Sequence, residues 1–365
     1  MVHYLYKSAI CHHIMRIAIV AGGTLGHVKP GNVLAQTLRK RHNVFYLTDR
    51  AMKPYVSGTP FLLDLEAKHT LIETPRFLMQ LSKAYLDART ILKQKKIGIV
   101  LSMGGYFTIP AVLAARSLRI PVYLFEQNAL PGRANRLLSR FSKLNIAFLP
   151  GPERYFKSKT MLCGNPVASH LFHLSQARSR KKLRIPRHTF VLLAFGGTNG
   201  AKDINEAVCS ILPRLKKKHI FIIHVTGKKY YDPLLPKYST YKQMIVRDFL
   251  ADLSAYYAAA DVVLCRAGAT SLVELWAARK PAIIVPHPHV KDNHQLYNAL
   301  YAAHKGTAIM IPSQRLHKEL LPTLRLLTQK RLRAMSNACA ACLPGNPTPL
   351  IVKTILNDHA RTKKP

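Results

Sequence analysis

The sequence predicts an α/β protein of two doubly wound domains, each a parallel sheet covered by helices, with a cleft between them. Short apolar segments alternate with amphipathic helical segments along most of the 365 residues. Gly-Gly-Thr follows an apolar segment twice, at 22–24 and again at 196–198, about 174 residues apart. A chain of this length also exceeds one ordinary hydrophobic core, so two domains are expected.

The first domain is placed at residues 15–166. It begins with the apolar strand 16–21, which runs into the Gly-rich turn 22–27 and an amphipathic helix. A second Gly-rich turn, 102–106, follows another apolar strand. Such turns open helices and offer backbone N–H groups to an anion. The further strands expected here lie at 44–47, 97–101, 121–125 and 145–148.

The second domain is placed at residues 186–345, where strand 190–195 and a second Gly-Gly-Thr turn repeat the start of the first domain. Residues 167–185 are expected to form a linker, and a C-terminal helix at about 348–360 is expected to return to the first domain. The further strands expected in the second domain lie at 220–226, 245–250, 262–264, 282–285 and 308–311.

The segment from Asp261 to Ala299 carries the clearest site signal. Gly268 and Ala269 form a small-residue turn at which a ligand can approach the backbone before a helix begins. Glu274 follows on that helix, where a carboxylate can accept two hydrogen bonds from a vicinal diol such as a ribose. The same pattern also fits an ordinary βαβ unit with a polar surface loop, so both interpretations stay open on these residues alone.

The charge is strongly basic, with 55 Lys and Arg against 17 Asp and Glu, a formal net charge of +38. Such a surplus attracts phosphates on nucleic acid, anionic lipid or a diphosphate substrate. A nucleic-acid-binding protein would need a contiguous basic stripe or aromatic residues spaced for base stacking, and neither pattern is visible. Nucleic acid is therefore not expected as a partner.

Several chemistries lack their motifs. The sequence has no GxSxG elbow, no Walker A lysine, no HExxH and no DxD triplet for a divalent metal under a diphosphate. His287, His289, Asp292 and His294 do not have a recognised metal-ligand spacing. The lone pair Cys339 and Cys342 does not indicate a metal or redox site. No metal and no cofactor are expected, and no segment reaches the ~18 apolar residues of a membrane span.

A set of seven motifs, in order over about residues 16–300, resembles the MurG family. The motifs are GGTxGH, GGY, EQN, GNPV, GGTNGA, CRAGATxxxE and DNHQxxNA. Members of this family are peptidoglycan-synthesis enzymes that transfer N-acetylglucosamine (GlcNAc) from UDP-GlcNAc to lipid I, undecaprenyl-diphospho-MurNAc-pentapeptide, to give lipid II. The resemblance implies a GT-B fold of two Rossmann-like domains and an inverting mechanism. It also implies peripheral location at the cytoplasmic face of the inner membrane.

The resemblance implies site residues as well. Glu274 would bind the ribose, Phe249 would cap the uracil beside Leu250, and the 196–200 turn would hold the donor phosphates. His27, with the 22–27 and 102–106 turns, would face the acceptor's diphosphate and its attacking 4-hydroxyl. His27 is the candidate general base because it lies inside a Gly-rich loop. The donor-binding set is Thr24, Asn128, Gly197, Thr198, Phe249, Leu250, Ala269, Thr270, Glu274, His294 and Gln295. The acceptor-binding set is Gly23, Gly26, His27, Gly104, Gly105 and Tyr106.

The expected partners are UDP-GlcNAc, lipid I and an anionic membrane surface, and other cell-wall synthesis proteins are candidates. Residues 75–89 are predicted to form an amphipathic membrane-docking helix flanked by cations. The same apolar stripe also fits a helix that packs inward, so both interpretations are kept. The apolar residues at helical spacing are Phe77, Leu78, Leu81 and Tyr85.

Three positions depart from the family pattern. Leu25 replaces a usual glycine in the first loop, and Ala168 stands where members often have an arginine that contributes to the site. Thr-Ile follows the GGY turn where Ser-Gly is common. The alternatives are another GT-B enzyme, such as a UDP-sugar:diacylglycerol transferase, or a UDP-GlcNAc epimerase. An epimerase would need acid/base carboxylates in the cleft, and acidic residues are scarce here.

Overall fold

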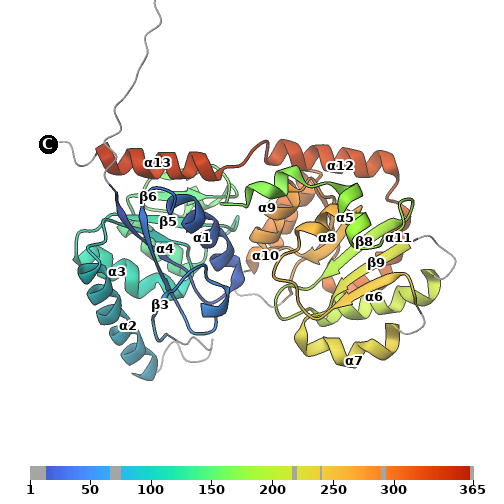
Figure 1. Cartoon of the computed structure of the whole chain (residues 1–365), viewed down its shortest axis with the longest axis horizontal. Helices are drawn as coiled ribbons and strands as arrows, with labels where there is room; N and C mark the ends of the chain where they lie inside the picture. The colour runs from blue at the N-terminus through green and yellow to red at the C-terminus, as the bar shows by residue number, and fades with distance from the viewer. Residues whose placement is uncertain (1–13, 66–74, 216–219, 239–240, 289–292, 362–365) are drawn as a thin grey trace, which may run out of the picture.

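The computed structural model describes residues 14–65, 75–215, 220–238, 241–288 and 293–361. They form two α/β domains that lie side by side along the long axis of the molecule (Figure 1). Each domain has one sheet in which all described strands are parallel. The predicted fold class of two doubly wound domains is confirmed.

The N-terminal sheet has the strand order β3-β2-β1-β4-β5-β6-β7. Its central strand, β1, alternates between two cores, because Ala18 and Val20 face one layer and Ile17 and Ile19 the other. The strands are β1 Arg16–Val20, β2 Asn43–Thr48, β3 Phe61–Leu62, β4 Ile99–Ser102, β5 Val122–Glu126, β6 Leu144–Ala147 and β7 Thr160–Leu162. The helices are α1 Leu25–Leu38, α2 Pro75–Gln94, α3 Ile109–Ser117 and α4 Arg133–Leu138.

The C-terminal sheet has the order β10-β9-β8-β11-β12-β13 and two similar cores. Its strands are β8 Phe190–Phe195, β9 Ile220–Val225, β10 Met244–Arg247, β11 Val262–Arg266, β12 Ala282–Val285 and β13 Ala308–Met310. Its helices are α6 Lys202–Leu215, α7 Lys228–Tyr238, α8 Ser254–Ala259, α9 Ala269–Ala277, α10 His294–His304, α11 Leu316–Arg325 and α12 Gln329–Cys342.

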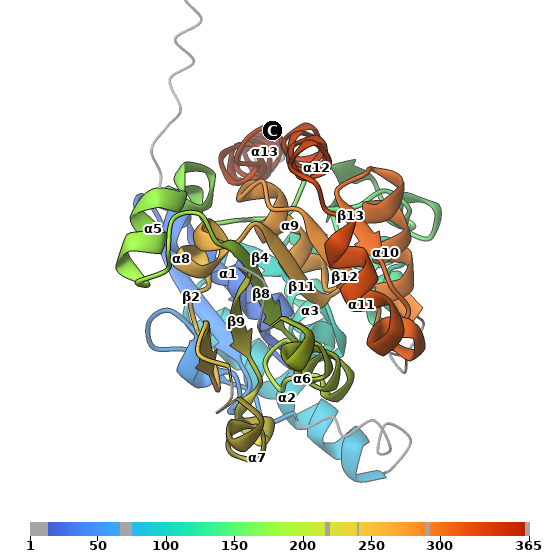
Figure 2. The same ribbon diagram turned by 90° about the vertical axis from the view of Figure 1, so that its right-hand side faces the viewer.

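The last helix, α13 (Thr348–Arg361), crosses from the C-terminal domain to the N-terminal domain. Figures 1 and 2 show α12 and α13 next to each other along one edge of the molecule. Ile351 and Ile355 are buried in the N-terminal core. Asp358 accepts a hydrogen bond from the Tyr123 hydroxyl at 2.7 Å and pairs with Lys143 at 2.8 Å. Apolar burial and this polar pair therefore attach the C-terminus to the first domain.

The chain crosses between the domains twice, and the two crossings lie side by side. The hydroxyl of Thr348, at the start of α13, lies 3.3 Å from both the N–H and the carbonyl oxygen of Val167. Gly164 lies close to Pro347, since a Cβ added at Gly164 would stand 3.0 Å from the proline ring. Any relative movement of the domains must therefore bend both segments at one place.

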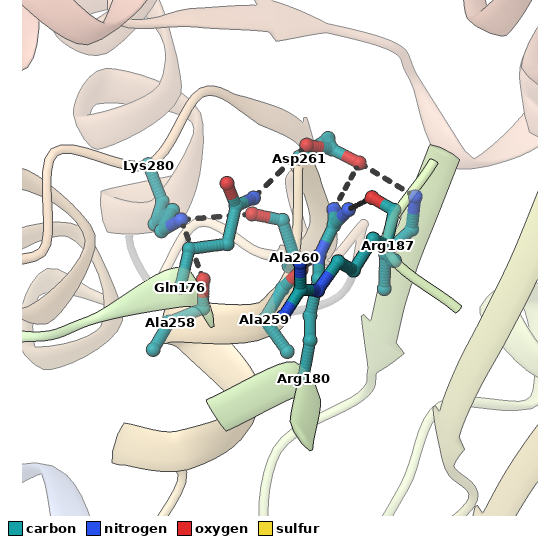
Figure 3. A network of polar contacts seen from close by, with 9 residues as sticks. Gln176, Arg180, Arg187, Ala258, Ala259, Ala260, Asp261 and Lys280 are labelled. Atoms are coloured by element: carbon teal, nitrogen blue, oxygen red, sulfur yellow. Dashed lines mark hydrogen bonds and ion pairs between the residues drawn. The ribbon is translucent and has the colours of Figure 1, made fainter. Parts of the chain in front are cut away.

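A short helix between the domains, α5 (Gln176–Lys182), is held by the C-terminal domain. Arg180 and Gln176 donate to the Asp261 carboxylate at 2.7 and 3.1 Å (Figure 3). Lys280 donates to the carbonyl oxygens of Ala258 and Ala260, at the end of α8. Burial lowers the pKa of Lys280 to about 8. This network fixes the segment that precedes β8.

The site forms where strand order reverses in each sheet. β1 lies between β2 and β4, and β8 lies between β9 and β11. Loops that leave such neighbouring parallel strands diverge to opposite faces and leave a crevice at the carboxyl end of the sheet. Both Gly-Gly-Thr turns follow these central strands, so the topology brings each of them to the rim of its own crevice.

Candidate functional site

A cavity of about 170 Å³ opens between the two domains. The N-terminal part of α1 forms one wall, and α8 and α9 form the opposite wall. The segment that joins the domains closes one side of the cavity. Its polar lining residues are Lys29, Asn32, His170, Asp252, Ser254, Tyr257, Thr270 and Glu274. The cavity is therefore shared between the domains, as a cleft site requires.

Glu274 lies in this cavity on α9, and its carboxylate is already hydrogen-bonded on both oxygens. The Lys29 ammonium of the N-terminal domain lies 2.9 Å from Oε1, and the Tyr257 hydroxyl donates to Oε2 at 2.9 Å. The Glu274 side chain is 13% exposed. Burial and the nearby carboxylate raise the pKa of Tyr257 well above 10, so this hydroxyl stays a donor. A diol that binds Glu274 would therefore share its oxygens with these partners or displace one of them.

The first Gly-rich loop, 22–27, is held by contacts on several sides. Gly23 donates its N–H to Asp49 Oδ2 at 2.6 Å, and the Asp49 carboxylate also accepts from the Met52 N–H at 2.9 Å. Across the cleft, the Thr270 hydroxyl donates to the Gly26 carbonyl at 2.8 Å. Thr270, predicted for the donor, therefore also joins α9 to this loop. The loop is fixed by both domains.

His27 occupies a defined position in this loop. Its Nδ1 lies 3.2 Å from the Gly22 carbonyl oxygen and 3.4 Å from the Thr24 hydroxyl. A carbonyl oxygen can only accept, so Nδ1 carries the proton, and Nε2 keeps its lone pair. Burial of the imidazole, with a smaller contribution from His294, lowers the pKa of His27 below 6.5. The ring is therefore neutral near pH 7 and able to accept a proton at Nε2.

The loop predicted for the acceptor lies directly against His27. Gly105 has a φ of +81°, and a Cβ there would lie 2.9 Å from His27 Cε1. A side chain at this position would push the imidazole away, so glycine permits the contact. The Tyr106 hydroxyl lies beside Gly23. Gly104, with a φ of +90°, packs against the Asn135 amide. The predicted acceptor residues are thus brought together.

The second Gly-Gly-Thr turn is more open. Gly197 has a φ of +89°, and Thr198 is exposed. Among the described residues, no acceptor takes the N–H of Gly197, Thr198 or Asn199. The turn is packed at both ends, where an added Cβ would lie 2.2 Å from the Ala201 nitrogen at Gly196 and 2.1 Å from the Thr226 carbonyl oxygen at Gly200. Backbone N–H groups at this helix start are accordingly available to an anion.

Asn128 is held by a polar relay that crosses the cleft. Glu126 Oε1 accepts from its backbone N–H at 2.9 Å and from its side chain at 3.1 Å. Burial raises the pKa of Glu126, while four hydrogen bonds to its carboxylate oppose that shift. Asn298 of the C-terminal domain donates to Asn128 Oδ1 at 3.0 Å and to the Ala267 carbonyl at 3.1 Å. Asn128 is thereby positioned by both domains.

The remaining predicted donor residues are not among those that line the cavity. Phe249 packs edge-on against Tyr55 of the N-terminal domain, with ring centroids 6.0 Å apart, and Leu250 is half-buried beside it. Gln295 accepts the His287 N–H at 3.0 Å. His294 begins α10, and Ala269, which begins α9, is buried. His289 and Asp292 lie outside the described residues.

The structure corrects one part of the membrane prediction. Phe77 on α2 is 7% exposed and belongs to the N-terminal core, so it cannot contact a membrane. Leu81 and Tyr85 are half-buried and pack against the same core, whereas Leu78 is 58% exposed. Met79 and Leu86, which were not singled out, are 73% and 61% exposed. Among the described residues, no helix is long and apolar enough to cross a membrane.

Sequence reasoning missed Lys29 and Asp49, although each contacts a predicted site residue. Lys29 lies two positions after His27, on the same helix start, which is a signal that the sequence offers. Asp49 directly follows β2 in the parallel sheet, where polar residues gather at the carboxyl edge. Their partners, Glu274 and Gly23, are distant in sequence, so only the fold shows these pairs.

Comparisons with known proteins agree with this architecture. The glycosyltransferase family 28 N-terminal domain matches residues 17–145, and the family 28 C-terminal domain matches residues 191–355. The crystal structure of Acinetobacter baumannii MurG matches with a TM-score of 0.73 and 27% identity, covering 94% of this chain and 99% of that one. A Neisseria meningitidis UDP-GlcNAc 2-epimerase, 17% identical with a TM-score of 0.63 over 94% of this chain and 100% of that one, shares the fold.

Two curated relatives bear the name UDP-N-acetylglucosamine–N-acetylmuramyl-(pentapeptide) pyrophosphoryl-undecaprenol N-acetylglucosamine transferase. The Acetivibrio thermocellus protein is 32% identical over 323 residues, which are 84% of this chain and 87% of the relative. The Myxococcus xanthus protein is 35% identical over 350 residues, 92% of this chain and 90% of the relative. The predicted GT-B fold is confirmed, and the chain belongs to the MurG family of glycosyltransferases.

Proposed function

We propose that this chain transfers GlcNAc from UDP-GlcNAc to the 4-hydroxyl of MurNAc in lipid I, forming lipid II for peptidoglycan synthesis. The relatives that cover most of the chain carry this activity in their names. One structural observation carries the proposal furthest: α1, which carries His27, meets α9 of the opposite domain, which carries Glu274. The Thr270–Gly26 hydrogen bond joins the two helix starts that hold them.

In the proposed reaction, the 4-hydroxyl oxygen attacks the anomeric carbon of GlcNAc. A bond forms between this oxygen and C1, and the bond from C1 to the β-phosphate oxygen breaks with inversion. UDP leaves with the electron pair, and His27 Nε2 takes the proton of the hydroxyl. The neutral imidazole, with its proton on Nδ1, suits this role.

The donor is assigned mainly to the C-terminal domain. Glu274 would accept the ribose hydroxyls, and the N–H groups of the 196–200 turn would bind the phosphates. Phe249, which meets Tyr55 of the N-terminal domain edge-on, would cover the uracil next to Leu250. Asn128, Ala269, His294 and Gln295 would contact the transferred sugar. Two contacts support this assignment: Asn128 is joined to Asn298 of the C-terminal domain, and Ala269 precedes the cavity-lining Thr270.

The direct test is radiolabel transfer from UDP-GlcNAc to lipid I by the purified protein. The expected result is a labelled lipid II together with an equal amount of UDP. Release of UDP that does not depend on lipid I would contradict the assignment of the acceptor. Conversion of UDP-GlcNAc to its 2-epimer would instead favour the epimerase alternative.

We also propose peripheral docking on an anionic membrane through α2, because the lipid tail of the acceptor stays in the bilayer. Leu78, Met79 and Leu86 supply exposed apolar surface, and the exposed Lys83 and Arg89 lie on the same helix. Each cation near an anionic surface contributes about 1 kcal/mol, and apolar side chains insert among the headgroups. Location at the cytoplasmic face of the inner membrane and contacts with other cell-wall synthesis proteins follow from the same proposal.

Vesicle binding tests this docking. Vesicles with anionic lipid should bind the protein more weakly as salt rises, because salt screens the cations. Changing Leu78 and Leu86 to Glu should weaken binding further. Leu326→Glu, at a leucine that is also 61% exposed but lies in the C-terminal domain, is the matched control. Equal binding by all three proteins would contradict docking through α2.

A further inference from the structure

One cleft cation has no assigned role. Lys29, on α1 of the N-terminal domain, reaches across the cavity to Glu274 on α9, with 2.9 Å between Nζ and Oε1. The Lys29 side chain is 31% exposed, so it retains contact with the open cleft. A ribose hydroxyl that binds Glu274 Oε1 would compete with Lys29 for this oxygen.

The donor brings a diphosphate into the same cleft. The sequence has no DxD triplet to hold a divalent metal beneath it, so the charge must be met by backbone N–H groups and cations. Among the described residues that line the cavity, Lys29 is the only lysine or arginine. Ala168 lies in the same wall and offers no charge. Arg266, just before the small-residue turn, is paired with Asp203 at 2.9 Å.

We propose that Lys29 is the cation that binds the donor diphosphate, and that it leaves Glu274 when the ribose hydroxyls take the carboxylate. This inference rests on the proposed UDP-GlcNAc donor. Ribose and diphosphate are separated only by the 5′-carbon, so a flexible lysine released at the ribose lies within reach of the phosphates. The ammonium exchanges one anion for another and is never left unpaired in the cleft.

The exchange also links donor binding to contact between the domains. Without donor, Lys29 joins α1 to α9 through Glu274. With donor, the same lysine would join α1 to a ligand held on the C-terminal domain. The contact between the N-terminal domain and the nucleotide would thereby depend on the phosphates. The remaining donor residues lie mainly on the other domain.

Calorimetric titration with UDP and with uridine tests the inference, because uridine has the ribose but no phosphates. Lys29→Met keeps the length of the side chain and removes its charge. UDP should bind this variant about tenfold more weakly or worse, while uridine should bind as well as before or more tightly, since its competitor for Glu274 is gone. Lys29→Arg should retain most of the UDP affinity.

Lys40→Met, at an exposed lysine just beyond the same helix, controls for the loss of one unit of net charge. Its UDP affinity should equal that of the parent. Equal weakening of UDP and uridine by Lys29→Met, or unchanged UDP affinity, would overturn the inference while leaving the donor site in place. A parent protein that bound neither ligand would overturn the donor assignment and this inference together.

Discussion

The two Gly-Gly-Thr turns share a sequence but differ in their surroundings. In the turn at 22–24, the Gly23 N–H is taken by Asp49, the Gly22 carbonyl faces His27, and Thr270 holds the neighbouring Gly26. In the turn at 196–198, Gly197 has open space around its Cα, and no described residue accepts its N–H. The two turns therefore differ at their second glycine: the protein takes the N–H of Gly23, whereas no described residue takes that of Gly197.

The difference indicates a division of labour. Asp49 takes the Gly23 N–H, so this group is not open to an anion, and the same loop holds the His27 side chain in place. A loop whose N–H groups are open at a helix start suits a phosphate. We therefore propose that the same local sequence positions a base in one domain and binds the leaving group in the other.

The largest expected effect comes from the first turn. His27→Ala should lower kcat by about 100-fold or more, because general base catalysis typically contributes that much. Donor KM should change little, since the second turn is intact. Steady-state kinetics with UDP-GlcNAc and lipid I measure both values. His173→Ala, at an exposed histidine, is the control, and near-parental kcat in His27→Ala would place the base elsewhere.

The next effect comes from the donor side. Glu274→Ala should raise the KM for UDP-GlcNAc about 10- to 100-fold, because a charge-assisted pair to the ribose, worth about 1.5–3 kcal/mol, is lost. Thermal unfolding should show that the variant is folded. Glu206→Ala removes an exposed carboxylate from α6 and should leave the KM unchanged. Parental donor kinetics in Glu274→Ala would mean that Glu274 serves only its pairs with Lys29 and Tyr257.

A matched pair of smaller changes compares the turns directly. Thr198→Ala should raise donor KM about 2- to 10-fold through loss of one hydrogen bond, with kcat nearly unchanged. Thr24→Ala changes the same position of the first turn. Unlike Thr198→Ala, it should lower kcat, because the Thr24 hydroxyl lies 3.4 Å from His27 Nδ1. If the two variants had identical kinetic effects, the turns would not differ in function.

The smallest effect is in the pH dependence. The pKa of His27 is lowered, so the ring loses its proton below pH 6.5 and is the active base above that point. The acid limb of kcat/KM should therefore lie below pH 6.5, with the rate falling as the ring becomes protonated. The residual activity of His27→Gln should lack this limb. A limb above pH 6.5 would show that another group titrates.

The sequence predicted the fold well because strands, Gly-rich turns and helices each leave a local pattern. Strands β1, β8 and β11 lie where their apolar segments indicated. The edge strands β3 and β7 were missed, since two or three residues are too few to show a period. Their pairing comes from the adjacent strands, which is information that the local sequence does not carry.

The candidate site was predicted in its parts but not in its connections. His27 and Glu274 were identified by their local context, yet the Lys29–Glu274 pair joins residues 245 positions apart and forms only when the domains meet. The sequence also could not show whether the apolar face of α2 packs on the core or is exposed to solvent. Periodicity places Phe77 and Leu81 on one face but does not say whether that face meets the core or solvent. In the structure, Phe77 lies in the core, and the exposed residues are Leu78, Met79 and Leu86.

The most direct test of the division between the turns is the affinity of His27→Ala for UDP, measured by calorimetry. We predict that this variant binds UDP as tightly as the parent does although its turnover is lost, because the donor phosphates are assigned to the second turn. If UDP affinity fell together with turnover, His27 and the first turn would belong to the donor site, and the proposed division would be contradicted.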